Sequence, residues 1–274
     1  MPQLVLKRAG EIAYRGAEPS QASERLPMLC VHGWPQSSYM WRHLLPELAS
    51  AGRRALAPDL PGFGDTPPDP PGTFERHVDT VERFRRRIGL DRVVLAVHDT
   101  GGLIGLRWAC DHPDSVGGLV ISNTGFFPGH DWIEIAKTMR TPIQGEALVN
   151  SLSREGFATL LEEASTEFDE RALDEYWKSF SSLGSRRGML ELYRSLDLDE
   201  LEPYQPRLAA LRVPTLILWG EQDEYLPLDY ATRFARQIPG SKLVLLEGVR
   251  HFLYEDEPER CAQEVIDFLG QAGI

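Results

Sequence analysis

The chain has 274 residues, of which 42% are hydrophobic, and a formal net charge of −12 at pH 7. This length and composition predict one globular unit, or one domain that carries a large insertion. The acidic balance argues against nucleic acid as a partner, because contacts to a phosphate backbone favour a clustered basic surface. No apolar run approaches the roughly 20 residues of a membrane span, so no membrane partner is expected.

The cysteines and the first residues bear on the cellular compartment. Cys30, Cys110 and Cys261 form an odd, widely spaced set within expected core elements, which is typical of buried free thiols in a reducing compartment. Residues 1–16 lack the long apolar core of a signal peptide. We therefore expect a cytoplasmic protein, and no feature of the sequence specifies an oligomeric state.

The first 126 residues alternate between strand and helix patterns. Two short strands joined at Ala9-Gly10 as a hairpin come first. Buried strands and amphipathic helices then follow in turn, with strands expected at 27–33, 53–60, 92–98 and 116–125 and helices at 37–52, 73–89 and 101–110. This alternation predicts a doubly wound, mostly parallel sheet that is flanked by helices.

Two of the expected helices carry specific predictions. A single helix over residues 37–52 would bury one face, which consists of Trp41, Leu44, Leu45 and Leu48. The helix over residues 73–89 has Thr73 as its expected N-cap. Its buried stripe is predicted to comprise Phe74, Val78, Val81 and Ile88.

The strand–helix alternation stops after residue 126 and resumes near residue 213. Residues 128–208 are mainly helical in pattern, and the end of the chain is expected to form strands at 213–223 and 242–248 and helices at 228–238 and from Pro258 onward. A helical insertion at this place predicts a lid over the carboxyl ends of the strands, where ligands bind in such sheets. We therefore divide the chain into a first core segment (1–127), a helical cap (128–208) and a second core segment (209–274).

Asp99 occupies a glycine-rich corner between an expected strand and an expected helix. The segment VVLAVHDTGG has the strand–turn–helix context in which many hydrolases place a nucleophile. The glycines after Asp99 allow a tight turn that lifts its carboxylate above the sheet, at a helix N-terminus that favours an anion. The alternative is that Asp99 is only an N-cap, which would explain an aspartate before any helix.

The turn His32-Gly33-Trp34-Pro35 follows a buried strand. Backbone N–H groups in such a turn can point at developing negative charge, so the N–H groups of Trp34 and Thr100 are expected to form an oxyanion hole. The alternative is a structural turn with a cis peptide bond before Pro35.

Asp223 and His251 follow later strands at the same edge of the expected sheet. A single aspartate or histidine is usually structural. Here, however, the chain order is a nucleophile candidate, an acid and a histidine, each in a loop after a strand. That order matches the α/β-hydrolase arrangement, and it favours the catalytic interpretation of all three residues.

These motifs resemble those of α/β-hydrolase-fold epoxide hydrolases and haloalkane dehalogenases, and the similarity extends over nearly the whole chain and is weakest in the cap. The resemblance implies an α/β-hydrolase fold, in which helices flank a mostly parallel sheet and a helical cap is inserted. It also implies that Asp99 is the nucleophile, that His251 is the general base and that Asp223 orients His251. The implied reactants are water and a small, apolar to moderately polar substrate.

An aspartate nucleophile suits attack on a saturated carbon. A serine attacking such a carbon would leave an ether, which water and an imidazole cannot cleave. A carboxylate leaves an ester, which they can cleave. Asp99 therefore favours epoxides or alkyl halides as substrates over esters and peptides, whose attack by a carboxylate would give an anhydride.

Epoxides and alkyl halides differ in the protein group that must stabilise the leaving atom. An epoxide oxygen requires a proton donor, and the segment GMLELYRSLD resembles the cap segment that carries such a tyrosine, which would be Tyr193. A second cap tyrosine is usual in epoxide hydrolases. Tyr176 is the candidate for it here, with His130 as another donor. Tyr193 could instead be a tyrosine on an amphipathic helix with a buried ring and a solvated hydroxyl.

A halide requires N–H donors, typically indoles. Dehalogenases of this group usually carry tryptophan directly after the nucleophile and often asparagine in the His-Gly-x-Pro turn, whereas this chain has Thr100 and Trp34. Indole groups are nevertheless available from other positions. We expect the substrate site to be lined by His32, Trp34, Trp132 and Trp177.

These features favour an epoxide hydrolase that forms vicinal diols, with a haloalkane dehalogenase as the alternative. A more distant alternative is a non-catalytic small-molecule receptor on the same fold. No metal site is expected, because His130, Asp131 and Glu134 lack a further ligand at suitable spacing. No cofactor is expected either, because the glycines of PGFGDT do not open a helix after a strand as a dinucleotide-binding motif does.

Overall fold

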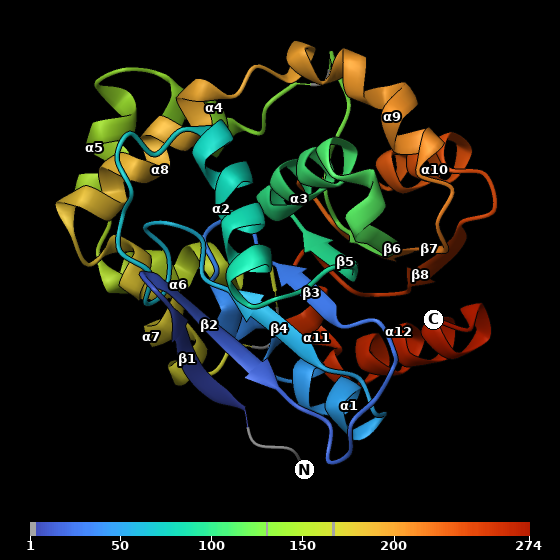
Figure 1. Ribbon diagram of the computed structural model, residues 1–274. Coiled ribbons are helices and arrows are strands. Elements are labelled where there is room, and N and C mark those ends of the chain that lie inside the picture. The colour runs from blue at the N-terminus through green and yellow to red at the C-terminus, as the bar shows by residue number, and fades with distance from the viewer. Residues whose placement is uncertain (1–3, 130, 166–167) are drawn as a thin grey trace.

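The computed structural model describes residues 4–129, 131–165 and 168–274. Within these ranges, eight strands form one sheet in the order β1-β2-β4-β3-β5-β6-β7-β8 (Figure 1). The strands are β1 (Val5–Ala9), β2 (Ile12–Ala17), β3 (Met28–Val31), β4 (Ala55–Pro58), β5 (Val93–His98), β6 (Val116–Ser122), β7 (Thr215–Gly220) and β8 (Lys242–Leu246). The neighbouring strands from β4 to β8 in this order are parallel, whereas the β1–β2 and β2–β4 pairs are antiparallel. Only β2 therefore runs opposite to the other strands.

The central strands are buried on both faces because helices cover both sides of the sheet. On one face, α1 (Leu44–Ser50) packs against α12 (Pro258–Ala272), and α12 contacts β7. The other face carries α2 (Phe74–Arg87), α3 (Thr100–Asp111) and α10 (Leu228–Gln237), as Figure 1 shows. The expected α/β-hydrolase architecture and the hairpin between β1 and β2 are therefore confirmed.

The prediction of a single helix over residues 37–52 is wrong, because the structure has two separate helical elements in this segment. A 3₁₀ turn, η1 (Ser38–Trp41), precedes α1, and its N-cap Ser37 accepts a hydrogen bond from the Tyr39 N–H. Pro46 lies in the first turn of α1, where its missing N–H and its ring prevent a continuous helix through the preceding turn. The predicted apolar face is nevertheless buried in full, at Trp41, Leu44, Leu45 and Leu48.

The start of α2 also differs from expectation. Thr73 is the N-cap residue, but its side chain makes no capping hydrogen bond. Instead, the Ser195 hydroxyl accepts from the Phe74 N–H at 2.8 Å. Ser195 ends a helix of the inserted segment, so the free N–H groups of α2 are satisfied partly by tertiary contact rather than by a local cap.

The inserted segment between β6 and β7 is helical. Its elements are α4 (Glu134–Arg140), α5 (Gln144–Ser151), α6 (Arg154–Glu162), α7 (Glu170–Trp177), η3 (Lys178–Phe180), α8 (Leu183–Ser195), η4 (Leu198–Tyr204) and α9 (Gln205–Ala210). In Figure 1 the helices α4 to α8 form a group at one side of the sheet. We call residues 128–208 the cap. The structure places α9 against α3, so the chain has returned to the core before β7 begins.

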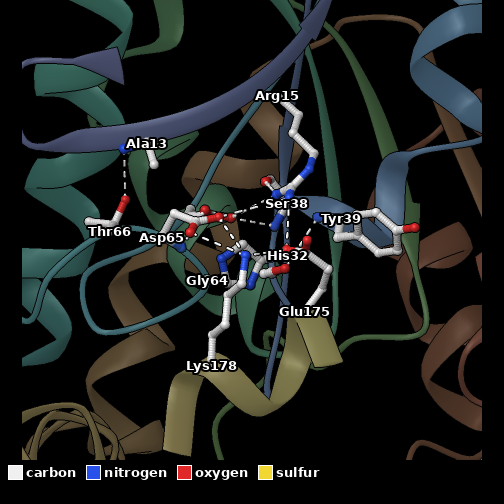
Figure 2. Close-up of polar contacts among 12 residues, drawn as sticks. Ala13, Arg15, His32, Ser38, Tyr39, Gly64, Asp65, Thr66, Glu175 and Lys178 are labelled. Carbon is white, nitrogen blue, oxygen red and sulfur yellow. Dashed lines mark hydrogen bonds and ion pairs between the residues drawn. The ribbon is translucent and has the colours of Figure 1, made fainter. Parts of the chain in front are cut away.

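A polar cluster joins α7 and η3 of the cap to the core (Figure 2). Arg15 of β2 donates to the Ser38 hydroxyl at 2.8 Å and to the Glu175 carboxylate at 2.8 Å. Lys178 donates to the same Glu175 carboxylate and to Asp65. The cluster therefore links one end of the cap to the segment that follows the His32–Pro35 turn.

A second junction is more deeply buried. The side chain of Glu255, which lies in the short helix α11 (Leu253–Asp256), is fully buried and accepts two hydrogen bonds from Arg42, at 2.7 and 3.0 Å. Gln36 donates to it from the core and Tyr176 from the cap. A buried carboxylate requires this many donors because the loss of hydration is costly.

Removing the cationic partner of Glu255 tests how strongly this junction stabilises the fold. Arg42→Met is expected to lower the free energy of unfolding by about 3–5 kcal/mol, since it leaves a buried carboxylate without its cation. The matched control is Arg54→Met, whose ion pair with Glu18 is partly exposed on both sides and should cost less than about 1 kcal/mol. If urea unfolding shows that both variants lose the same free energy of unfolding, the strong stabilisation that we assign to the Arg42–Glu255 pair is contradicted.

Candidate active site

Asp99 lies between β5 and α3 in a backbone conformation that a non-glycine residue rarely adopts. Its φ and ψ angles are 50° and −132°. Two hydrogen bonds hold the residue in this strained conformation. The Asp99 N–H donates to the Asn123 carbonyl, and the Thr124 hydroxyl donates to the Asp99 carbonyl. Such strain is typical of functional corners, where a side chain must be lifted away from the sheet.

The corner also depends on close approach by the backbone. A Cβ atom on Gly33 would lie 2.4 Å from the Asp99 Cβ atom, and one on Gly102 would lie 2.0 Å from the Thr124 hydroxyl oxygen. Only glycine fits at these two positions without displacing the corner. The glycines of the HGWP turn and of the HDTGG motif therefore have a direct packing role.

One oxygen of the Asp99 carboxylate faces hydrogen-bond donors. Its Oδ1 atom accepts from the Trp34 N–H at 2.8 Å and from the Thr100 hydroxyl at 2.8 Å, and the Thr100 backbone N–H is near enough to lower the pKa of this carboxyl group. The two backbone groups that were expected to form an oxyanion hole thus meet at the Asp99 carboxyl group.

The other oxygen faces the histidine. Asp99 Oδ2 lies 3.5 Å from His251 Nε2, and His251 Nδ1 lies 2.8 Å from Asp223 Oδ2. The imidazole is therefore held between two carboxylates. Asp223 is itself held by the backbone N–H groups of Tyr225 and Leu226, which donate to its Oδ1 atom.

Asn123 and His98 complete the arrangement, and sequence reasoning did not identify either. Asn123 donates from its side-chain amide to Asp223 at 2.6 Å and accepts from the Gly220 N–H at 3.0 Å. His98 Nε2 lies 2.9 Å from the His251 carbonyl, which fixes the loop that carries the imidazole. Asn123 follows β6 at the same sheet edge as Asp99 follows β5, and that position was the available signal.

Burial and charge set the protonation of the site. Burial alone would lower the pKa of His251, but Asp223 and Asp99 outweigh it and raise this pKa to about 10. Burial alone would raise the pKa of Asp99, but hydrogen bonding and charge from His251, together with the Thr100 backbone, lower it to about 2. The resting site is therefore an ion pair of a carboxylate and an imidazolium.

Tyr193 reaches Asp99 through Thr100. The Tyr193 hydroxyl lies 3.1 Å from the Thr100 hydroxyl. Since the single proton of Thr100 is donated to Asp99, Tyr193 must be the donor in this pair. Burial and the nearby Asp99 charge raise the pKa of Tyr193 well above its ordinary value, so the phenol is protonated at neutral pH.

Two small cavities open beside Asp99. One, of about 50 Å³, is lined by residues that include Thr100, Trp132 and Tyr193. The other, of about 30 Å³, is lined by residues that include Trp34, Tyr193 and His251. Tyr225, which directly follows the Asp223 turn and was not predicted, lines both and contacts the His251 ring. We call these two cavities together the catalytic chamber.

Three expected site residues do not line the chamber. The Tyr176 hydroxyl donates to Glu255 instead, so the prediction of Tyr176 as a second donor near Asp99 is wrong. His32 is fully buried, and its Nε2 atom accepts from the Leu60 N–H, so His32 supports the turn and does not contact substrate. Trp177 stacks on Phe180 at 5.4 Å. His130 lies outside the described residues.

Two further findings concern the described part of the chain. It contains no group of three or more metal-ligating side chains that could hold a metal ion. No helix within it is long and apolar enough to cross a membrane.

Comparisons with known proteins identify the family of the chain. Residues 27–258 match the family described as the alpha/beta hydrolase fold. Haloalkane dehalogenase 2 of Mycobacterium bovis is 29% identical over 258 residues, covering 89% of this chain and 88% of that protein. A haloalkane dehalogenase of Bradyrhizobium diazoefficiens is 27% identical, covering 99% and 96% of the two chains.

Solved structures give the same result for the fold. The crystal structure of DBJA superposes with a TM-score of 0.84 at 26% identity, over 100% of this chain and 98% of that chain. The haloalkane dehalogenase DbeA of Bradyrhizobium elkani has a TM-score of 0.84 at 24% identity, over 100% and 99% of the two chains, and this likeness concerns the fold alone. The chain therefore belongs to the α/β-hydrolase superfamily, in the group that contains epoxide hydrolases and haloalkane dehalogenases.

Proposed function

We propose that this protein hydrolyses a bond between a saturated carbon and a leaving group through a covalent ester on Asp99. The observation that carries the proposal is the position of the Asp99 carboxylate, with the Trp34 N–H on one oxygen and His251 beside the other. A serine hydrolase would have a hydroxyl at this corner. A carboxylate here can be alkylated and then regenerated.

The first half of the proposed reaction forms the ester. An Asp99 oxygen attacks the saturated carbon, and the bond between that carbon and the leaving group breaks with its electron pair going to the leaving group. Oδ2 is the better nucleophile, since Oδ1 is held by the Trp34 N–H and the Thr100 hydroxyl. Oδ1 then becomes the carbonyl oxygen of the ester.

The second half cleaves the ester with water. His251 takes a proton from water, and the resulting hydroxide attacks the carbonyl carbon of Asp99. The Trp34 and Thr100 N–H groups stabilise the negative charge that develops on Oδ1. Collapse of this tetrahedral state breaks the bond between the carbonyl carbon and the alkyl oxygen, and the departing alkoxide takes the proton held by His251. The new carboxyl group of Asp99 then gives its own proton to His251, which restores the carboxylate with one oxygen atom derived from water.

Ester formation prepares His251 for its role as base. In the resting site the charges of Asp223 and Asp99 raise the pKa of His251 to about 10, so the imidazole is protonated. Esterification removes the Asp99 charge and with it one of the two raising interactions. The pKa of His251 then falls, so the ring can release its proton to solvent and afterwards accept one from the attacking water.

A halide is the first leaving group to test. Curated relatives that match 89% and 99% of the chain are named haloalkane dehalogenases, so the comparisons favour this alternative over the epoxide hydrolase that the motifs suggested. The chain carries Thr100 directly after Asp99, so a halide would have to be stabilised by other donors. Trp132 and Tyr193 line the chamber and can supply them.

An epoxide is the second candidate, and Tyr193 is the observation that favours it. Its buried, protonated hydroxyl lies in the chamber and is one hydroxyl away from Asp99. A phenol can give a proton to the oxygen of an opening epoxide ring, whereas a departing bromide needs no proton.

Trapping the ester on an inactive base variant tests the function and identifies the leaving group. His251→Gln removes the base but leaves Asp99 able to attack. We expect the Asp99 peptide to gain the mass of an alkyl group from 1-bromobutane, or of a hydroxyalkyl group from 1,2-epoxybutane. The double variant with Asp99→Asn is the control, and absence of an adduct from both reagents would contradict the proposal.

Tyr193→Phe separates the two leaving groups. If Tyr193 protonates an epoxide oxygen, its loss should slow ester formation with 1,2-epoxybutane by about 10²-fold, because the alkoxide then departs without a proton. Ester formation with 1-bromobutane should slow less, because Tyr193 would give a departing bromide only a hydrogen bond and no proton. Equal slowing with both reagents, measured by rapid-quench mass spectrometry, would show that Tyr193 does not act as a proton donor.

The raised pKa of His251 makes stability depend on pH in a defined window. Its ordinary pKa is 6.5 and its folded-state pKa is about 10, so the folded protein binds the extra proton between these values. The stabilisation is complete below pH 6.5 and is lost as the pH rises toward 10. Urea unfolding from pH 6 to 10 should show that the free energy of unfolding falls more steeply with pH for wild type than for His251→Gln. Identical pH dependences of the two proteins would contradict the raised pKa of His251.

A further inference from the structure

The side-chain hydroxyl of Thr100 holds Asp99 Oδ1 in the resting site, but the proposed hydrolysis of the ester draws only on the Thr100 backbone. Thr100 is the first residue of α3 and is almost fully buried. Its hydroxyl oxygen lies 2.8 Å from Asp99 Oδ1 and 3.1 Å from the Tyr193 hydroxyl oxygen. A buried hydroxyl in direct contact with the reacting carboxyl group is in a position to act in the reaction.

The direction of these two hydrogen bonds follows from the chemistry of the partners. A carboxylate oxygen only accepts, so the Thr100 hydroxyl donates its single proton to Asp99 Oδ1. The Tyr193 hydroxyl therefore donates to the Thr100 oxygen. A hydroxyl that accepts one hydrogen bond is polarised and gives a stronger one. Tyr193 thus makes the Thr100 hydroxyl a better donor toward Oδ1.

The oxygen that faces Thr100 is the one that carries negative charge during ester hydrolysis. Oδ1 also accepts from the Trp34 N–H at 2.8 Å, whereas His251 lies beside Oδ2. Attack by Oδ2 leaves Oδ1 as the carbonyl oxygen, and water then pushes negative charge onto it. The Trp34 N–H and the Thr100 hydroxyl both lie at a distance typical of an oxyanion hole, about 2.7–3.1 Å.

A donor to Oδ1 affects the two half-reactions in opposite directions. In ester formation, negative charge leaves the Asp99 carboxylate, so the donor stabilises the starting state more than the transition state. In ester hydrolysis, negative charge develops on Oδ1, so the same donor stabilises the transition state and accelerates the step. The loss of such a donor should therefore make the ester accumulate.

We infer that the Thr100 hydroxyl is a third, side-chain donor of the oxyanion hole, and that Tyr193 acts on ester hydrolysis through it. This inference rests on the proposed function, because it requires an ester on Asp99. Thr100 keeps its proton throughout, and His251 remains the base that takes the proton of the water. The position that usually supplies an indole in dehalogenases of this group thus supplies a hydroxyl to the nucleophile here.

Thr100→Val tests the inference, because valine has nearly the shape of threonine and lacks the hydroxyl. Enzyme in excess is mixed with 1-bromobutane or 1,2-epoxybutane, and the rise and decay of the Asp99 ester are followed by rapid-quench mass spectrometry. Decay should slow by about 10²-fold, whereas formation should be unchanged or faster. Thr100→Ser keeps the hydroxyl and should restore the decay rate.

Two further variants keep the test decisive. Thr100→Ala also lacks the hydroxyl and adds no atoms, so it gives the same comparison if Thr100→Val does not fold. Thr80→Val is the matched control, because the buried Thr80 hydroxyl donates to the Arg76 carbonyl within α2; it should form and hydrolyse the ester as wild type does. Equal slowing of both steps in the Thr100 variants would indicate a merely structural role and overturn the inference.

Tyr193→Phe tests the path through Thr100. Alone, it should slow ester decay less than Thr100→Val does, because the Thr100 hydroxyl still donates to Oδ1. Added to Thr100→Val, it should slow decay no further. Independent slowing in the double variant would overturn the action of Tyr193 through Thr100.

The outcomes also separate this inference from the proposed function. An ester that decays at the wild-type rate in Thr100→Val and Thr100→Ala would leave the covalent mechanism standing and overturn the role of the Thr100 hydroxyl. Absence of an ester from every variant, His251→Gln included, would contradict the covalent mechanism itself and the inference with it.

Discussion

A largely buried carboxylate at position 99 is costly unless donors surround it, and most of the site can be understood from that constraint. Water would hydrate such a group fully, and the protein has to replace this hydration. The Trp34 N–H and the Thr100 hydroxyl serve one oxygen and the His251 imidazolium the other. The positive charge on His251 in turn requires Asp223, and Asp223 requires Asn123 and two backbone N–H groups.

The same constraint explains why the residues that carry the site lie on the core rather than the cap. Parallel strands bring their carboxyl ends to one edge, so β5, β6 and β7 deliver Asp99, Asn123 and Asp223 to neighbouring positions. Asp99 and Asn123 directly follow the last paired residues of β5 and β6, and Asp223 lies in the turn that follows β7. The cap contributes Tyr193 and the apolar walls, and it is held to the core by the Arg15 cluster and by Glu255. The walls of the cap can therefore change without disturbing the contacts among Asp99, His251 and Asp223.

Local patterns were sufficient to predict the core and insufficient for the cap. Strand and helix periodicity, the HGWP turn and the HDTGG corner predicted the sheet and the meeting of Asp99, Asp223 and His251 at one edge. Tyr176 and His32 were misjudged because their roles depend on buried partners, Glu255 and the Leu60 N–H, that are distant in sequence. Helix packing in the cap is set by such tertiary contacts, which periodicity does not contain.

The most direct test of the central claim follows an oxygen atom. Wild-type enzyme in excess is allowed one turnover of its substrate in ¹⁸O-labelled water, and the peptide that contains Asp99 is then weighed. A covalent ester predicts one ¹⁸O atom in the Asp99 carboxylate and an unlabelled alcohol or diol. A labelled product with an unlabelled Asp99 would mean that water attacks the substrate directly, and would contradict the role of Asp99 as nucleophile.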